Sequence, residues 1–142
     1  MLPCMSDRSL ARRYFEDLFN AGELGVADEI LHPEISFVGP ITPEGIYGID
    51  AYRRFALEWY KGFPDRRFEL VEEWVDGDRI ACLFHITGTH QGVFLGQPAT
   101  GNTIDVEAMN VFRIEGGRIR SIQAFFDPAH LLQPLGLTKP PR

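Results

Sequence analysis

The sequence is poor in cysteine and in basic residues, and each shortage excludes a class of protein. Its 142 residues include two cysteines, Cys4 and Cys82, which are too few and too far apart for a disulfide framework or a Cys-x-x-Cys site. Fourteen Lys and Arg against 20 Asp and Glu give a formal net charge of −6, the wrong sign for binding a phosphate backbone. We therefore expect no nucleic-acid partner.

Long apolar runs are also missing. No stretch approaches the roughly 18 apolar residues of a membrane-spanning helix, and the N-terminus lacks a basic region followed by an apolar run. We therefore expect a cytoplasmic protein without a membrane partner. No pair of histidines and carboxylates has the spacing of a metal site, so no metal is expected.

Apolar and aromatic residues are abundant. Hydrophobic residues make up 44% of the chain and aromatic residues 12%, with 11 Phe. A chain of this length buries a core without disulfides or metals, and it has no room for a second domain. We therefore predict one folded domain over residues 1–142, with a core or pocket walled by aromatic side chains.

Helices are predicted in the first half of the chain, from the helical spacing of apolar residues. Three are expected: one capped by Ser6 or Asp7 and ending at Gly22, one over residues 24–31, and one from Ile49 or Asp50 to Phe63. A short strand over residues 35–38 and a Pro- and Gly-rich loop over residues 39–48 separate the last two helices.

Strand patterns occupy the second half. Residues 67–75 and 79–89 are predicted to form a hairpin, and a Gly-rich connection over residues 88–102 leads into two long strands joined at Glu115-Gly116-Gly117. Helices followed by a four-strand meander are typical of an α+β fold. We predict a curved antiparallel sheet with the three N-terminal helices on its concave face.

Asn110 is the one amide in an otherwise apolar row of the first long strand. A two-residue loop in the last hairpin would pair Asn110 with Gln123, whereas a three-residue loop with Gly117 in a bulge would pair it with Ala124. We prefer the second register because it places apolar residues opposite apolar residues.

Several segments resemble the SnoaL-like polyketide cyclases of the NTF2-like superfamily. They are LFNAGEL, EILHPEI, GTHQGVFLGQPATG, FRIEGGRI and the closing LLQPLG, which together span nearly the whole chain. The resemblance implies a cone-shaped barrel with one deep apolar pocket, a homodimer, and neither a metal nor an organic cofactor.

The resemblance also implies where catalytic residues should be. In the family, an Asp on the last strand is the general acid and base of an aldol ring closure, helped by a His on the preceding strand. Counting from FRIEGGRI places the His position on Asn110 and the Asp position on Ala124. Since alanine cannot carry a proton, the family's reaction would lose roughly 10²- to 10⁴-fold in rate. Asn110 can orient a carbonyl or enolate oxygen, or be a buried amide bonded to backbone or water.

Two further residues are weak candidates for proton transfer, and no catalytic residue is assigned. His90 has a suitable pKa and lies among glycines that indicate a close backbone approach, although a loop histidine is more often solvated or bonded to backbone. Asp127 precedes Pro128 and fits the N-cap of a helix better than a catalytic site. An enzyme would require a His or a carboxylate in the pocket beside Asn110.

The expected ligand is a small, mostly apolar, aromatic or polyketide-like molecule. We predict that it contacts Asn110, Ala124, Tyr14, Phe37, Trp59, Phe63, Phe84, Phe112, Ile122 and Phe126. The protein is then a cofactor-independent cyclase or isomerase with a rearranged site, or a non-catalytic ligand-binding or dimerisation module that has lost the acid–base pair. A related epoxide hydrolase or ketosteroid isomerase would need inward carboxylates or a Tyr–Asp pair, which the sequence does not reveal. Met109, Val111 and Phe125 fall on the opposite face, where we expect a homodimer contact.

Overall fold

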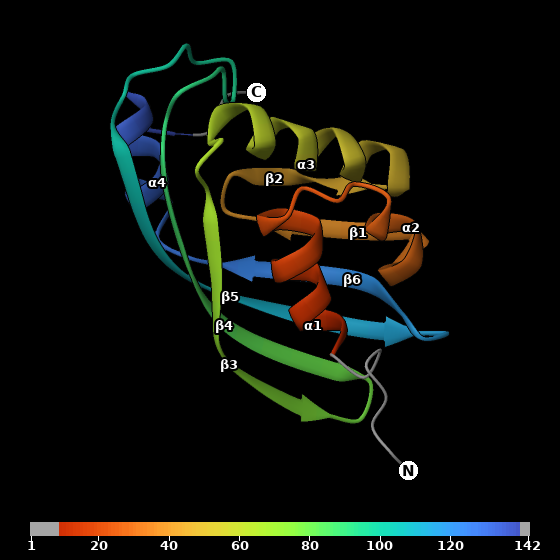
Figure 1. The fold of residues 1–142 in the computed structure, drawn as a ribbon. Helices are drawn as coiled ribbons and strands as arrows, with labels where there is room; N and C mark the ends of the chain where they lie inside the picture. Colours follow the sequence, from red (N-terminus) through yellow and green to blue (C-terminus); the bar gives the residue numbers. More distant parts are fainter. Residues whose placement is uncertain (1–8, 140–142) are drawn as a thin grey trace.

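Residues 9–139 are described by the computed structural model of the protein (Figure 1). The helices are α1 (Leu10–Arg12), the π-helix η2 (Arg13–Asn20), α2 (Val26–Ile30), α3 (Ile49–Gly62), α4 (Pro128–Leu132) and the 3-10 helix η3 (Gln133–Leu135). The strands are β1 (Leu31–Gly39), β2 (Thr42–Tyr47), β3 (Arg67–Asp76), β4 (Arg79–Thr89), β5 (Thr103–Glu115) and β6 (Arg118–Phe125).

The first described helix begins where a side chain supplies a missing hydrogen bond. The Ser9 hydroxyl accepts from the N–H of Arg12 at 3.1 Å and is the N-cap of α1. The predicted caps, Ser6 and Asp7, lie outside the described residues. From Arg13 the helix widens into η2, in which hydrogen bonds span five residues. The buried side chains of η2 are the predicted apolar stripe, namely Tyr14, Phe15, Leu18 and Phe19.

The two later predicted helices are confirmed, one with nearly the predicted length and one shorter. The helix α3 follows the predicted bounds closely and buries Tyr52, Ala56 and Trp59. The helix α2 is shorter than predicted, because Leu31 already belongs to β1. A residue before proline prefers an extended backbone, so the strand continues through Pro33.

The segment predicted as a loop over residues 39–48 instead contains strand β2. It pairs with β1 through Phe37 and Ile46 and lies at the edge of the sheet. An edge strand needs hydrogen bonds on one side only, which is why it accommodates Pro43 and Gly45. The prediction was wrong because proline and glycine were interpreted as marking a loop.

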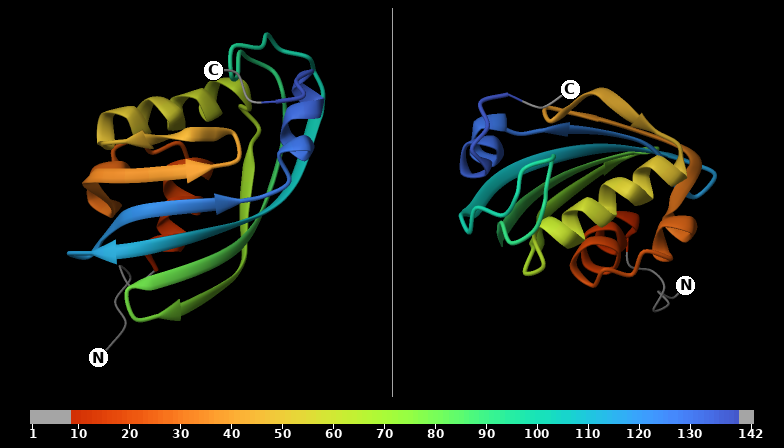
Figure 2. Two further views of the ribbon diagram at one scale, coloured as in Figure 1. Left: turned by 180° about the vertical axis from the view of Figure 1, so that it is seen from behind. Right: turned by 90° about the horizontal axis from the view of Figure 1, so that it is seen from above.

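The six strands form one curved sheet in the order β2-β1-β6-β5-β4-β3. The strands β3 to β6 are antiparallel neighbours, which confirms the predicted meander. The strand β1 pairs with β6 in parallel, so the sheet is mixed. Figure 2 shows the sheet curving around η2 and α3, which lie on its concave side. The predicted α+β fold is confirmed.

The last hairpin pairs Asn110 with Ala124, as predicted, but by a different route. The turn holds two residues, because Glu115 pairs directly with Arg118, and both turn glycines have a positive φ. The register shifts beyond the turn, where Arg120 is an extra residue on β6. The predicted three-residue loop is therefore wrong, although the pairing it was meant to explain is right.

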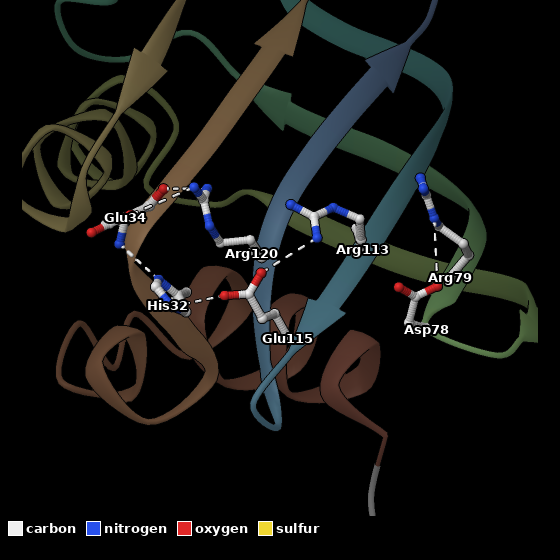
Figure 3. A network of polar contacts seen from close by, with 7 residues as sticks. All are labelled: His32, Glu34, Asp78, Arg79, Arg113, Glu115 and Arg120. Atoms are coloured by element: carbon white, nitrogen blue, oxygen red, sulfur yellow. Dashed lines mark hydrogen bonds and ion pairs between the residues drawn. The ribbon is translucent and has the colours of Figure 1, made fainter.

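Polar contacts hold this bulge to the neighbouring strand (Figure 3). The Arg120 guanidinium donates to the backbone oxygen of Glu34 at 2.6 Å and lies 3.6 Å from its carboxylate. At the turn, the Glu115 carboxylate lies 3.4 Å from Arg113 and 3.6 Å from His32. Exposed ion pairs contribute only about 0–1 kcal/mol each. The bond to a backbone oxygen nevertheless positions the extra residue against β1.

The Gly-rich connection after β4 packs on the end of α3. The N–H groups of Gln91 and Gly92 both donate to the Gly62 carbonyl, at 2.9 and 3.3 Å. A Cβ at position 92 would lie 2.1 Å from the carbonyl oxygen of Lys61, so only glycine fits there. At Gly92, the close approach indicated by the glycines is therefore an approach to α3.

Candidate functional site

An apolar pocket lies between the concave face of the sheet and the helices. The cavity inside it has a volume of about 40 Å³. Aromatic side chains from η2, α3 and the strands form most of its wall. The polar side chains in that wall are Tyr14, Asn110 and the indole of Trp59. Such a composition suits a flat apolar molecule with few polar atoms.

Most of the predicted ligand contacts line this pocket. They are Tyr14, Phe37, Trp59, Phe84, Asn110, Ala124 and Phe126. Three others, Phe63, Phe112 and Ile122, are buried in the core and are not part of the wall. Phe63 packs on Trp59 and Phe94 rather than into the pocket, with ring centroids 5.3 and 5.1 Å away.

Sequence analysis missed other parts of the wall. They are Phe19, Ile41, Phe55, Phe68, Ile86, Val106 and Leu131. Alternation along the strands could have found Ile86 and Val106, which are direct partners across β4 and β5. Ile41 and Leu131 come from the β1–β2 turn and from α4, where no long periodic pattern marks an inward face.

Asn110 lines the pocket and has a buried acceptor without a partner. Its side chain is 2% exposed, and its Oδ1 has no hydrogen-bond partner among the described residues. It is flanked by Cys82 on β4 and Ala124 on β6, neither of which offers it a hydrogen bond. Leaving a buried acceptor unsatisfied costs about 1–3 kcal/mol, so this oxygen is available to a donor on a ligand.

Tyr14 is the second polar group, and it is joined to a residue of another helix. Its hydroxyl shares a short hydrogen bond with the hydroxyl of Tyr52 on α3. Both side chains are almost wholly buried, at 3% and 0% exposure. The Tyr14 ring lies 5.1 Å, centroid to centroid, from Phe112, which is two residues from Asn110 along β5. Two polar groups thus lie in an otherwise apolar wall.

Burial keeps the hydroxyls of Tyr14 and Tyr52 and the thiol of Cys82 protonated. Desolvation raises the pKa of Tyr14 well above that of an ordinary tyrosine, against the opposing effect of its bond to Tyr52. Desolvation and the neighbouring Tyr14 raise the pKa of Tyr52 as well. Burial similarly raises the pKa of the Cys82 thiol to about 12. Near neutral pH the tyrosines therefore donate hydrogen bonds and do not act as bases.

The two weak candidates for proton transfer, His90 and Asp127, do not line the pocket. His90 is fully buried, and its Nδ1 accepts from the N–H of Thr100 at 3.2 Å, which places its proton on Nε2. That Nε2 has no partner among the described residues. The Asp127 carboxylate accepts from the N–H of Ala129 at 3.0 Å as the N-cap of α4, which confirms the capping interpretation.

Within residues 9–139, no group of three or more His, Cys, Asp or Glu side chains is placed to hold a metal ion. In the same part of the chain, no helix has the length and apolar character needed to cross a membrane.

The fold and the site define an α+β protein with a curved sheet wrapped around one apolar pocket. The family model of the SnoaL-like polyketide cyclases matches residues 9–135, and the chain belongs to this family. The predicted resemblance is confirmed.

Two curated relatives have named activities. The chain is 30% identical over 115 residues to the aklanonic acid methyl ester cyclase DnrD of Streptomyces peucetius, covering 78% of this chain and 77% of the relative. It is 28% identical over 122 residues to the nogalonic acid methyl ester cyclase of Streptomyces nogalater, covering 83% and 89%. Among solved structures, TsrD from Streptomyces laurentii has a TM-score of 0.79 at 27% identity, covering 97% of this chain and 100% of that chain.

Proposed function

We propose that this protein binds a flat, mostly apolar, polyketide-like molecule in the pocket and orients it by shape and hydrogen bonds. The observation that carries the proposal is the wall itself, in which aromatic and aliphatic side chains surround Tyr14 and Asn110. The ligand class is taken from the family and from the two relatives, which are cyclases of the methyl esters of aklanonic and nogalonic acid.

A second candidate function is a cofactor-independent cyclase or isomerase with a rearranged site. Membership of the cyclase family favours this function. Tyr14 and Asn110 favour it as well, because their polar groups can bind the oxygen of a developing enolate. Against it, no His, Asp or Glu occurs among the described residues that line the pocket. Because proton transfer near neutral pH needs such a group, binding is the better supported function.

Filling the pocket is expected to prevent the binding of a flat apolar probe. The protein should bind N-phenyl-1-naphthylamine, whose fluorescence rises in apolar surroundings. Ala124→Phe should weaken this binding by at least about tenfold, because the added ring occupies the pocket. Ala99→Phe is the matched control, since it makes the same substitution at an exposed position of the connection between β4 and β5, outside the sheet. No binding by the unmodified protein, or an equal loss in both variants, would contradict the proposal.

We also propose that a second copy of the chain covers the outer face of the sheet. Trp74 and Phe125 on that face are 46% and 49% exposed, and Val111 lies between their strands on β5. An apolar centre with polar neighbours such as Gln123 suits the self-complementary contact of a two-fold dimer. Light scattering should give a molar mass twice that of one chain, and Phe125→Arg should reduce the molar mass to that of a single chain. A monomeric unmodified protein would refute the dimer.

A further inference from the structure

Charge changes sign along the outer face of strand β5. Every second side chain of this strand faces outward, because the side chains between them are buried on the concave side. Followed along the chain, the outward residues are two acids, two apolar residues and a base, namely Asp105, Glu107, Met109, Val111 and Arg113. On this face the strand therefore has an acidic end, an apolar centre and a basic end.

The neighbouring strands extend this pattern into bands. Arg79 on β4 is the direct partner of Arg113, so two bases lie side by side at the basic end (Figure 3). At the acidic end, His85 on β4 stands between Glu107 on β5 and Glu69 on β3. The band between the two ends is apolar and is made by Trp74, Ala81, Leu83, Met109, Val111 and Phe125.

The carboxylates beside the two bases pair with them only loosely. Arg79 lies 3.6 Å from the Asp78 carboxylate, and Arg113 lies 3.4 Å from the Glu115 carboxylate. Both distances exceed the about 2.7–2.9 Å of a close charge-assisted hydrogen bond. Asp76 on β3 also flanks Arg79, so β5 shows the change of sign most clearly. The Arg113 side chain is 33% exposed, and its guanidinium can pair with a carboxylate from another chain.

Two copies that share the outer face can be related by a two-fold axis that lies in the interface. If the axis ran along the strands, each band would face the same band of the partner, with base against base and acid against acid. If the axis runs across the strands, the basic band faces the acidic band and the apolar bands face each other. Like charges that face one another at an interface are strongly unfavourable, whereas opposite charges complement one another. The charge pattern therefore selects the axis across the strands.

We propose that the two-fold axis of the dimer crosses the strands over the middle of β5, so that Arg113 of each copy pairs with Glu107 of the partner subunit. The same axis places Val111 against Met109 of the partner subunit, which joins the two apolar bands. This inference rests on the proposed dimer. It adds the orientation of the two copies and the pair of charges that selects this orientation.

Reversing the two charges tests the orientation. Arg113→Glu and Glu107→Arg should each raise the Kd of the dimer at least about tenfold, because each puts like charges opposite one another. Both substitutions in one chain should return the Kd to within about threefold of the unmodified value, because opposite charges again face each other. The Kd is measured by sedimentation over a dilution series. Arg54→Glu is the matched control, since it makes the same charge change at an exposed position of α3 and should leave the Kd unchanged.

Salt gives a second readout on the unmodified protein, which still decides if a variant fails to fold. Raising NaCl from about 0.05 to 0.5 M should raise the Kd, because salt screens the attraction between opposite charges. With base against base, salt would screen a repulsion and lower the Kd. The inference is overturned, and the dimer stands, if the single variants match the unmodified protein, if the double variant dimerises no more tightly than they do, or if the Kd falls with salt. If the unmodified protein is a monomer, the dimer and the inference fall together.

Discussion

Replacing Phe15 with alanine is expected to lower the free energy of unfolding by about 3–5 kcal/mol. Phe15 is fully buried on η2, and its ring lies 4.5 Å from Phe84 and 6.3 Å from Phe112, centroid to centroid. Its removal leaves a cavity between a helix and the sheet. Because both elements are held by their own backbone hydrogen bonds, the surrounding structure can close this cavity only in part.

Such a loss is large beside the roughly 5–15 kcal/mol that stabilises an ordinary domain. The Tm should fall by about 10–20 °C, and urea unfolding should show a lower midpoint with an unchanged slope. Val71→Ala is the control, because this β3 side chain is 58% exposed and its truncation should cost less than about 0.5 kcal/mol. A similar small loss for Phe15→Ala would contradict the packing of η2 on the sheet.

Restoring the acid–base pair implied by the family resemblance should produce the largest change in activity. Asn110 and Ala124 are direct partners across β5 and β6, so their Cβ atoms lie about 4.5–5.5 Å apart. Asn110→His combined with Ala124→Asp therefore puts an imidazole within reach of a carboxylate inside the pocket. Assayed with nogalonic acid methyl ester, named in the Streptomyces nogalater relative, this double variant should form cyclised product about 10²- to 10⁴-fold faster than the unmodified protein.

The burial of position 124, which is 6% exposed, should raise the pKa of the new carboxyl group toward neutrality, as a general acid requires. Asn110→His alone and Ala124→Asp alone each supply one member of the acid–base pair, so each should gain much less cyclisation activity. Arg113→His with Ser121→Asp is the matched control, because it joins the same two side chains across the same strands on the outer face. Product is measured by chromatography with mass detection. If the outer pair, Arg113→His with Ser121→Asp, gained as much cyclisation activity, the pocket assignment would be refuted. It would also be refuted if Asn110→His with Ala124→Asp gained no activity but still bound N-phenyl-1-naphthylamine.

Much of the fold could be predicted because local patterns decide it. The stripe of α3 and the alternation of β3 and β4 predicted those elements nearly to the residue, and alternation predicted β5 and β6 as two long strands. The strand β2 could not be predicted in this way. Its Pro43 and Gly45 are acceptable only because no strand pairs with its outer side, and a position at the sheet edge is a property of the whole fold.

The site was predictable in part for the same reason. Alternation placed Asn110 and Phe84 on the inward face, and helical spacing placed Tyr14 and Trp59 there. The bond between Tyr14 and Tyr52 was not foreseen, because a helical stripe shows which face is buried but not which residue of another helix it meets. That contact depends on how η2 and α3 pack on the concave face.

The sequence by itself determined that neither Asn110 nor Ala124 can act as an acid or base near neutral pH, since ionisation is a property of the side chain, and its apolar pattern favoured the register that pairs them. Only the tertiary structure decided how that register is reached. An extra residue, Arg120, shifts β6 by one position, and its guanidinium bonds to the backbone of Glu34, 86 residues away on β1. Register depends on such long-range contacts, which no local pattern encodes.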